Sequence, residues 1–262
     1  MVLTSNARIM YDRCPLCEST SLAPVKQTDC TQHPNYHSSL PPTMTWMKCS
    51  KCEHVFTDGY FTGDALAILF SKTVAHQAIG FQVEQQRMIS ANMIEKILPF
   101  QYAGRWLDIG AGNGSLLFTA SEYGFDAVGV DLRQDNVTIL RELGFEAHCS
   151  DFQDLKNVPE FNVISMADVL EHMPFPVKAL QHVRRLLVEV GVTLISMPNS
   201  ESMIWRFADQ SNANPYWGEL EHYHNFSRTR LYNLLSDSGF QPLRYGISER
   251  YRMCMEIVAI KT

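Results

Sequence analysis

Four cysteines in the first quarter of the chain have the spacing of a metal site. Cys14 and Cys17 form one Cys-x-x-Cys motif, and Cys49 and Cys52 form a second. Two thiolates at this spacing can reach one ion, and four thiolates close the tetrahedral shell of a structural zinc ion without an open position for catalysis. The 31 residues between the motifs exceed the usual interval of a zinc ribbon, so we expect a loop or an extra hairpin there. The pattern predicts structural Zn²⁺.

The same segment contains other potential ligands and one alternative chemistry. Cys30, His33, His37 and His54 could replace a cysteine, but we interpret the histidines as neutral surface residues. A redox Cys-x-x-Cys motif normally stands alone at the start of a helix, whereas this proline-containing segment has two. Acidic and basic residues balance up to residue 60, so we do not expect a nucleic-acid finger.

A glycine-rich turn could hold a cofactor. Gly110, Gly112 and Gly114 let a ligand approach bare backbone, and the helix that follows would offer unpaired N–H groups. Asp131 ends the next predicted strand, twenty-one residues after Gly110, where a carboxylate can accept hydrogen bonds from both ribose hydroxyls. Together these residues favour a cofactor that contains adenosine.

Residues around the turn distinguish two kinds of cofactor. The dinucleotide fingerprint G-x-G-x-x-G fails, because its last position falls on Ser115 when counted from Gly110 and on Leu117 when counted from Gly112. Asp108 would repel a pyrophosphate but could attract an ammonium group. The sequence therefore favours a cofactor with an amino-acid tail, and a nicotinamide-dependent oxidoreductase is the first alternative.

Four successive motifs resemble those of class I S-adenosylmethionine-dependent methyltransferases. They are Leu-Asp-Ile-Gly-Ala-Gly-Asn-Gly at 107–114, Gly-Val-Asp at 129–131, Ser-Asp-Phe at 150–152 and Asp-Val-Leu-Glu-His-Met at 168–173. The resemblance covers about residues 82–262. It implies a Rossmann-like sheet with a closing antiparallel hairpin, S-adenosylmethionine as cofactor and transfer of its methyl group to an acceptor.

The resemblance also implies which residues bind the cofactor. We predict a site made of Asp108, Gly110, Ala111, Gly112, Asn113, Gly114, Asp131, Leu132, Asp151, Phe152, Met166, Ala167 and Leu170. The glycines would line the methionine moiety, Asp131 would hold the ribose, and Asp151 and Phe152 would flank adenine. The alternatives are a helix N-cap for Asp151 and core packing for Phe152.

A segment rich in histidine could supply a general base. We predict His222, then His224, then His172 for this role, because imidazole titrates near neutrality. In extended backbone His222 and His224 would share a face. A structural histidine is the alternative for each.

The acceptor is indicated by two weaker features. Trp205, Tyr216 and Trp217 could form an apolar or sugar-stacking wall. The N-terminal cysteine motifs resemble the zinc modules of bacterial methyltransferases that act on deoxysugars, capsular glycans and natural products, which implies a sugar or natural-product hydroxyl.

The elements that must position these residues alternate between strand and helix, as in an α/β fold. We predict strands at 106–109, 127–130, 146–149, 161–166 and 192–196, and a closing pair at 243–247 and 255–260. Helices are expected to begin near residues 114, 134, 176 and 227, the third running to Gly191, and 199–225 is expected to be irregular. The short connection 248–254 makes the last pair an antiparallel hairpin.

These features predict three parts and exclude several classes of partner. We expect a zinc module at 1–60, a helical linker or cap at 61–100, and a doubly wound seven-stranded methyltransferase domain at 101–262. A net charge of −6 disfavours nucleic acid, and without an export signal or a membrane-length apolar run we expect a cytoplasmic protein with a small-molecule acceptor. The rival to an enzyme is a non-catalytic cofactor-binding scaffold, and the acceptor and the oligomeric state stay open.

Overall fold

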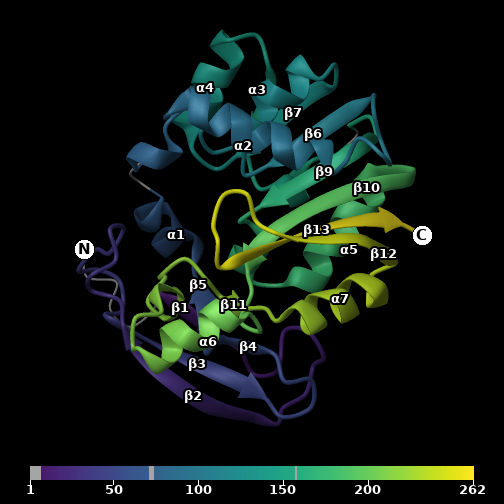
Figure 1. Ribbon diagram of the computed structural model, residues 1–262. Helices are drawn as coiled ribbons and strands as arrows, with labels where there is room; N and C mark the ends of the chain where they lie inside the picture. The colour runs from purple at the N-terminus through teal and green to yellow at the C-terminus, as the bar shows by residue number, and fades with distance from the viewer. Residues whose placement is uncertain (1–6, 71–73, 157) are drawn as a thin grey trace. The chain divides into compact units, whose positions relative to one another are not determined.

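The computed structural model describes residues 7–70, 74–156 and 158–262, and these form two compact units. The cysteine unit comprises the described residues of Met1–Lys72 together with Glu171–Val177 and Pro198–Leu234. The sheet unit comprises the described residues of Thr73–Leu170 together with Lys178–Met197 and Leu235–Thr262. The chain therefore passes between the units several times (Figure 1).

The sheet unit is built on seven strands in the order β12-β13-β10-β9-β6-β7-β8. These strands are β6 (Arg105–Ile109), β7 (Asp126–Asp131), β8 (Glu146–Cys149), β9 (Phe161–Ala167), β10 (Leu187–Pro198), β12 (Phe240–Ile247) and β13 (Cys254–Lys261). The five from β6 to β10 pair in parallel, whereas β12 and β13 pair antiparallel. The predicted doubly wound sheet with a closing hairpin is confirmed.

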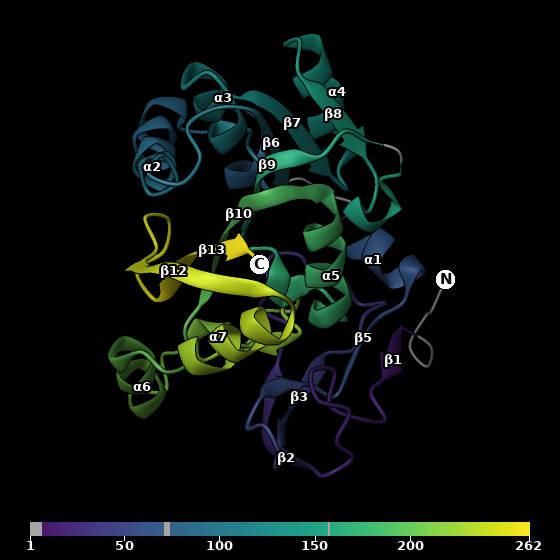
Figure 2. The ribbon, with the colours of Figure 1, turned by 90° about the vertical axis from the view of Figure 1, so that its right-hand side faces the viewer.

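Helices of the sheet unit bury apolar residues in its core. They are α2 (Val83–Glu95), α3 (Ser115–Glu122), α4 (Gln134–Glu142) and most of α5 (Pro176–Leu186), whereas the residues of α7 (Arg228–Asp237) divide between the two units. Residues of α2, α3 and α4 share one core cluster with the strands, for example Ile94, Leu117 and Leu140, all fully buried. Figure 2 shows α2 and α5 on opposite sides of β10.

The end of α5 differs from the prediction. The helix expected to reach Gly191 ends at Leu186, because Leu187 already pairs with Phe161 in the sheet. Val190 has φ 57° and is 61% exposed, so it contributes nothing to a helical stripe. The β-branched valines of this segment favour a strand, and its register shifts before Val192.

The cysteine unit contains a four-stranded antiparallel sheet in the order β11-β4-β3-β2. Its strands are β2 (Leu22–Asp29), β3 (Thr43–Cys49), β4 (Val55–Thr57) and β11 (His224–Asn225); a separate pair is β1 (Arg8–Met10) with β5 (Gly59–Phe61), followed by α1 (Gly63–Leu69). The β2–β3 pair is the extra hairpin expected between the cysteine motifs. The stretch 199–225 is not wholly irregular, since it contains α6 (Met203–Gln210) and the two residues of β11.

A single apolar cluster holds distant parts of the cysteine unit together. Trp46 of β3 and Phe61 of β5 are buried with Leu220 and Tyr223, more than 150 residues later in the sequence. Within the described part of the chain, none of the helices is both long and apolar enough to cross a bilayer.

Candidate cofactor site and active site

The four cysteines of the two motifs converge as the spacing predicts. Their sulfur atoms lie within 4.8 Å of one another, with 3.6 Å between Cys14 and Cys52 and 3.6 Å between Cys17 and Cys49. Thiolates about 2.3 Å from one zinc ion are about 3.8 Å apart in a tetrahedron, whereas a disulfide needs about 2.05 Å. The donor set therefore fits a tetrathiolate zinc ion.

The other potential ligands of this segment have different partners. Cys30 is buried in the apolar cluster, and His33 Nε2 lies 3.0 Å from Glu219. The interpretation of the histidines as surface residues is wrong for His54, which is 1% exposed and lies 2.9 Å from His224. His37 is consistent with it, since it is exposed and its Nδ1 accepts a local hydrogen bond from Ser39 N–H.

The glycine turn follows β6 and opens α3. Gly110 has φ +72°, and a Cβ there would lie 2.7 Å from Val169 Cγ2, so this position requires glycine. The Asn113 side chain accepts a hydrogen bond from Ser115 N–H at 3.1 Å and donates one to the His76 carbonyl. Asn113 thus stabilises the turn by a hydrogen bond within it and joins the turn to the segment that contains His76.

Asp108 lies in β6 immediately before this turn and is 2% exposed. Its Oδ1 accepts a 2.6 Å hydrogen bond from the Ser165 hydroxyl, while its Oδ2 has no hydrogen-bond partner within the described residues. Burial raises the pKa of Asp108 to about 6, although Ser165 and the positive charge of Arg250 act to lower it. A buried, unsatisfied carboxylate oxygen is a natural partner for an ammonium group.

Asp131 ends β7 and faces the same turn. Its Oδ2 accepts from Gly112 N–H at 2.9 Å, and its Oδ1 accepts from Arg133 N–H at 2.8 Å. Each carboxylate oxygen can accept two hydrogen bonds, so both retain capacity for a ribose hydroxyl. The neighbouring Leu132 is 53% exposed.

The remaining predicted cofactor residues lie at the ends of other strands of the sheet unit. Asp151 is exposed and caps a 3₁₀ turn by accepting from Gln153 N–H at 2.9 Å, and Phe152 is 2% exposed with its ring 5.5 Å from that of His182. Asp151 therefore makes the contact of an N-cap and Phe152 that of a core residue, which were the alternatives to adenine binding. Met166 and Ala167 end β9, and Leu170, like Ala111 in the turn, is buried.

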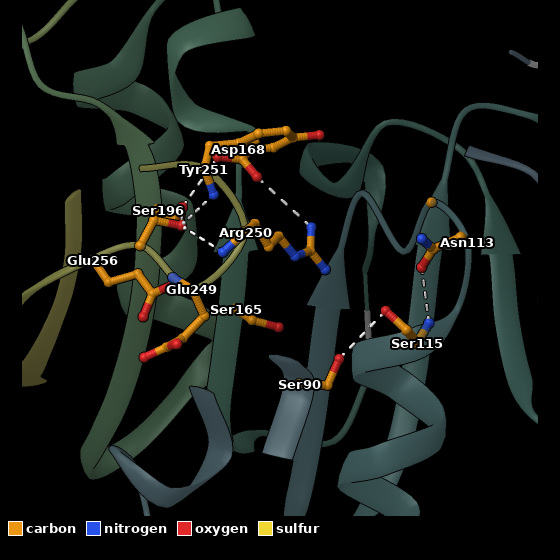
Figure 3. A network of polar contacts seen from close by, with 12 residues as sticks. Ser90, Asn113, Ser115, Ser165, Asp168, Ser196, Glu249, Arg250, Tyr251 and Glu256 are labelled. Atoms are coloured by element: carbon orange, nitrogen blue, oxygen red, sulfur yellow. Dashed lines mark hydrogen bonds and ion pairs between the residues drawn. The ribbon is translucent and has the colours of Figure 1, made fainter. Parts of the chain in front are cut away.

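A polar network beside these residues was not predicted (Figure 3). Asp168, in the left-handed region at φ 60°, accepts from the Ser196 hydroxyl at 3.0 Å and forms an ion pair with Arg250 at 3.8 Å. Ser165, which holds Asp108, belongs to the same strand as Met166. The signal in the sequence that could have indicated this network is Ser165, a polar residue inside the apolar run 163–167.

The predicted base residues lie in the cysteine unit, on two segments bonded to each other. His172 Nδ1 donates to the Glu221 carbonyl at 2.9 Å, and Tyr223 N–H donates to the Glu171 carbonyl at 2.9 Å. The ring of His172 is perpendicular to that of His222, with 4.6 Å between centroids. Glu171, His172 and His222 therefore form one group, which we call the His–Glu cluster.

His224 and His222 have different ring partners: His224, in β11, stacks on His54, whereas His222 packs against His172 and Tyr216. His224 Nε2 donates to the Met173 carbonyl at 2.9 Å, so its Nδ1 accepts from His54 at 2.9 Å. Burial lowers the pKa of His224 to about 3 and that of His222 well below its usual value. Since both nitrogens of His224 are engaged, the geometry favours His222 and His172 over His224.

A protein-family comparison identifies the fold built around these residues. The model of the family described as "Methyltransferase domain" matches residues 81–245. The chain belongs to this family. The resemblance to class I S-adenosylmethionine-dependent methyltransferases is thereby confirmed.

Curated relatives match part of the chain. It is 29% identical over 115 residues to a ubiquinone biosynthesis O-methyltransferase of Psychrobacter cryohalolentis, and 30% identical over 105 residues to one of Glaesserella parasuis. These matches cover 39% and 36% of this chain and 44% of each relative. The chain thus spans less than half the length of these relatives.

Solved structures share the fold of the chain. A 1,6-didemethyltoxoflavin-N1-methyltransferase from Burkholderia thailandensis, with bound 1,6-didemethyltoxoflavin and S-adenosylhomocysteine, has a TM-score of 0.57 at 20% identity and covers 81% of this chain and 97% of its own. A magnesium protoporphyrin IX methyltransferase from Synechocystis, with bound S-adenosylhomocysteine, has a TM-score of 0.54 at 16% identity and covers 69% and 85%.

Proposed function

We propose that this methyltransferase moves the methyl group of S-adenosylmethionine to a hydroxyl of a small molecule. The observation that carries the cofactor assignment is Asp108 Oδ2, which has no hydrogen-bond partner in the described part of the chain and lies beside the glycine turn, with Asp131 at the end of the adjacent strand. An ammonium group and a ribose are the two polar parts of this cofactor that such residues recognise. The nicotinamide alternative lacks support, because a pyrophosphate would meet the Asp108 carboxylate.

The cofactor brings an already activated methyl group, so the protein's task is to align the acceptor and exclude water. The acceptor oxygen forms the new C–O bond while the C–S bond breaks toward sulfur. A hydroxyl must also lose its proton, and we assign this task to the His–Glu cluster, with His222 as its central residue. The exposed fraction of His222 is only 7%, which suits a group shielded from bulk water.

Three features support an oxygen acceptor on a sugar or natural product. The two sequence relatives described above are named O-methyltransferases, and the cysteine motifs resemble those of sugar and natural-product methyltransferases. Tyr216 stacks on Trp205 at 5.6 Å and on His222 at 5.9 Å, which gives the cluster an aromatic wall of the kind that packs against sugar rings. We also propose that the four cysteines bind structural zinc.

An acceptor screen tests this proposal. Purified protein, methyl-labelled S-adenosylmethionine and a panel of sugar nucleotides, phenols and amines should give label transfer to hydroxyl compounds and none to amines. His222→Ala should lower the rate with the best acceptor by about 100-fold or more, the usual scale of general acid–base catalysis, without changing cofactor binding. Transfer only to amines, or an undiminished rate in His222→Ala, would contradict the proposal.

A further inference from the structure

The His–Glu cluster has the composition and the compactness of a second metal site. One ligand atom from each of Glu171, His172 and His222 lies within 4.8 Å of the others. Ligands about 2.1 Å from a common ion lie about 3–3.5 Å apart, so small side-chain rotations would bring the three ligand atoms to one ion. Glu171 is 1% exposed, and half-buried His172 gives the cluster a route to solvent.

His172 is oriented as metal-binding histidines are. Its Nδ1 lies 2.9 Å from the Glu221 carbonyl oxygen, which can only accept, so Nδ1 carries the proton and Nε2 carries the lone pair. In metal sites a carbonyl or carboxylate commonly fixes the ligating histidine in this way. Glu171, the residue before His172, is held at its backbone, because its carbonyl accepts a hydrogen bond from Tyr223 N–H.

His222 supplies an independent observation. Its Nδ1 is buried and has no hydrogen-bond partner among the residues that the structure describes. An imidazole nitrogen shielded from water is costly to leave unsatisfied. A cation among His222, His172 and Glu171 would satisfy it.

We propose that Glu171, His172 and His222 bind one divalent first-row transition-metal ion, such as Zn²⁺, at a site separate from the four cysteines. Two imidazoles and one carboxylate suit such an ion, whereas Mg²⁺ and Ca²⁺ prefer oxygen ligands alone. Three protein ligands leave open coordination positions, unlike the closed tetrathiolate site. This proposal rests on the proposed function and deepens it: with the ion bound, the lone pairs of His222 and His172 are used as ligands, and an acceptor hydroxyl at an open position would lose its proton to solvent more readily beside the positive charge.

Cobalt binding tests the site directly, because Co²⁺ reports its ligands in its absorption spectrum. Chelator-treated full-length protein would be titrated with Co²⁺, with bound metal counted by mass spectrometry. We expect two classes of site, one with the strong near-ultraviolet charge-transfer bands of thiolate ligation and one with only the weak visible bands of nitrogen and oxygen ligation. Glu171→Gln and His222→Gln should weaken the second class by about 100-fold or more. His37→Ala, an exposed histidine of the same unit, should leave both classes unchanged.

The outcomes separate this proposal from the methyltransferase function. Each variant is checked by circular dichroism and by binding of S-adenosylhomocysteine, which depends on the sheet unit. A thiolate class alone, or a second class unchanged in both variants, overturns the cation site even when S-adenosylhomocysteine binds normally. A second Co²⁺ lost in both folded variants supports it. Failure of S-adenosylhomocysteine to bind would instead overturn the proposed function.

Discussion

At the residue scale, Asp108 makes cofactor affinity depend on pH. Its pKa of about 6 is raised mainly by burial, and the ionised form is the one that attracts an ammonium group. S-adenosylhomocysteine should therefore bind about tenfold more weakly at pH 5 than at pH 7. Isothermal titration across this range measures the effect.

An argument from stability and one control variant connect this pH dependence to Asp108. A carboxyl whose pKa is raised by folding does not lose stability when it is protonated, so its protonation does not unfold the protein. Asp108→Asn should bind weakly at every pH, with the pH dependence gone. Constant affinity of the unsubstituted protein between pH 5 and 7 would rule out this role.

Gly110 gives a second residue-scale prediction with a matched control. Gly110→Ala should lose S-adenosylhomocysteine binding, because the new Cβ would meet Val169 at 2.7 Å and the residue keeps φ +72°. Gly124→Ala places alanine at φ +92° with no atom within 4 Å, so it should cost only about 1 kcal/mol of stability and retain binding. Equal binding by the two variants, measured by titration calorimetry, would contradict this account of the turn.

At the element scale, Lys96 joins the end of α2 to the β12–β13 hairpin. Its Nζ lies 2.6 Å from Glu256, whose side chain is 1% exposed, and 2.7 Å from Glu249. Lys96→Met would leave a buried carboxylate without its cation and should lower the free energy of unfolding by about 3 kcal/mol. Adding Glu256→Met should recover most of this loss in urea denaturation. A single variant as stable as the unsubstituted protein would show that the ion pair contributes little.

The cysteine motifs should stabilise the sheet that carries His224. β3 ends at Cys49, and β4, which follows Cys52, pairs with β11. Cys49→Ser should therefore lower the zinc content and increase amide hydrogen exchange in 55–57 and 222–226, while β6 and β7 stay protected. Cys30→Ser, a buried cysteine outside the cluster, is the control and should keep both zinc and protection. Unchanged exchange after zinc loss would contradict the structural role of the ion.

The sequence predicted those elements whose signals are local. The glycine turn and Asp131 lie at the junctions of apolar strands, and each cysteine pair is two residues apart, so periodicity and spacing were sufficient. The end of α5 was predicted wrongly because Leu187 and Val190 continue its apolar period, although strand pairing with Phe161 begins at Leu187.

At the scale of the whole molecule, contacts between distant segments could not be predicted. The bond between His54 and His224 spans 170 residues, and Tyr223 packs with Trp46 across a similar interval. Nothing in the local pattern distinguishes such residues from surface loop residues. The same reason kept Glu171 outside the predicted site, since its relation to His222 depends on the pairing of segments 171–173 and 221–224.

The candidate sites are divided between the two units. The sheet unit holds the glycine turn with Asp108 and Asp131, and the cysteine unit holds the His–Glu cluster and the four cysteines. Cofactor binding can therefore be measured before any acceptor is known.

Isothermal titration of the purified protein with S-adenosylhomocysteine, repeated with Asp131→Ala, tests the central claim most directly. We predict a dissociation constant on the order of micromolar for the unsubstituted protein and no measurable binding for the variant. No binding of S-adenosylhomocysteine or S-adenosylmethionine by the unsubstituted protein, together with binding of NADH, would contradict the account.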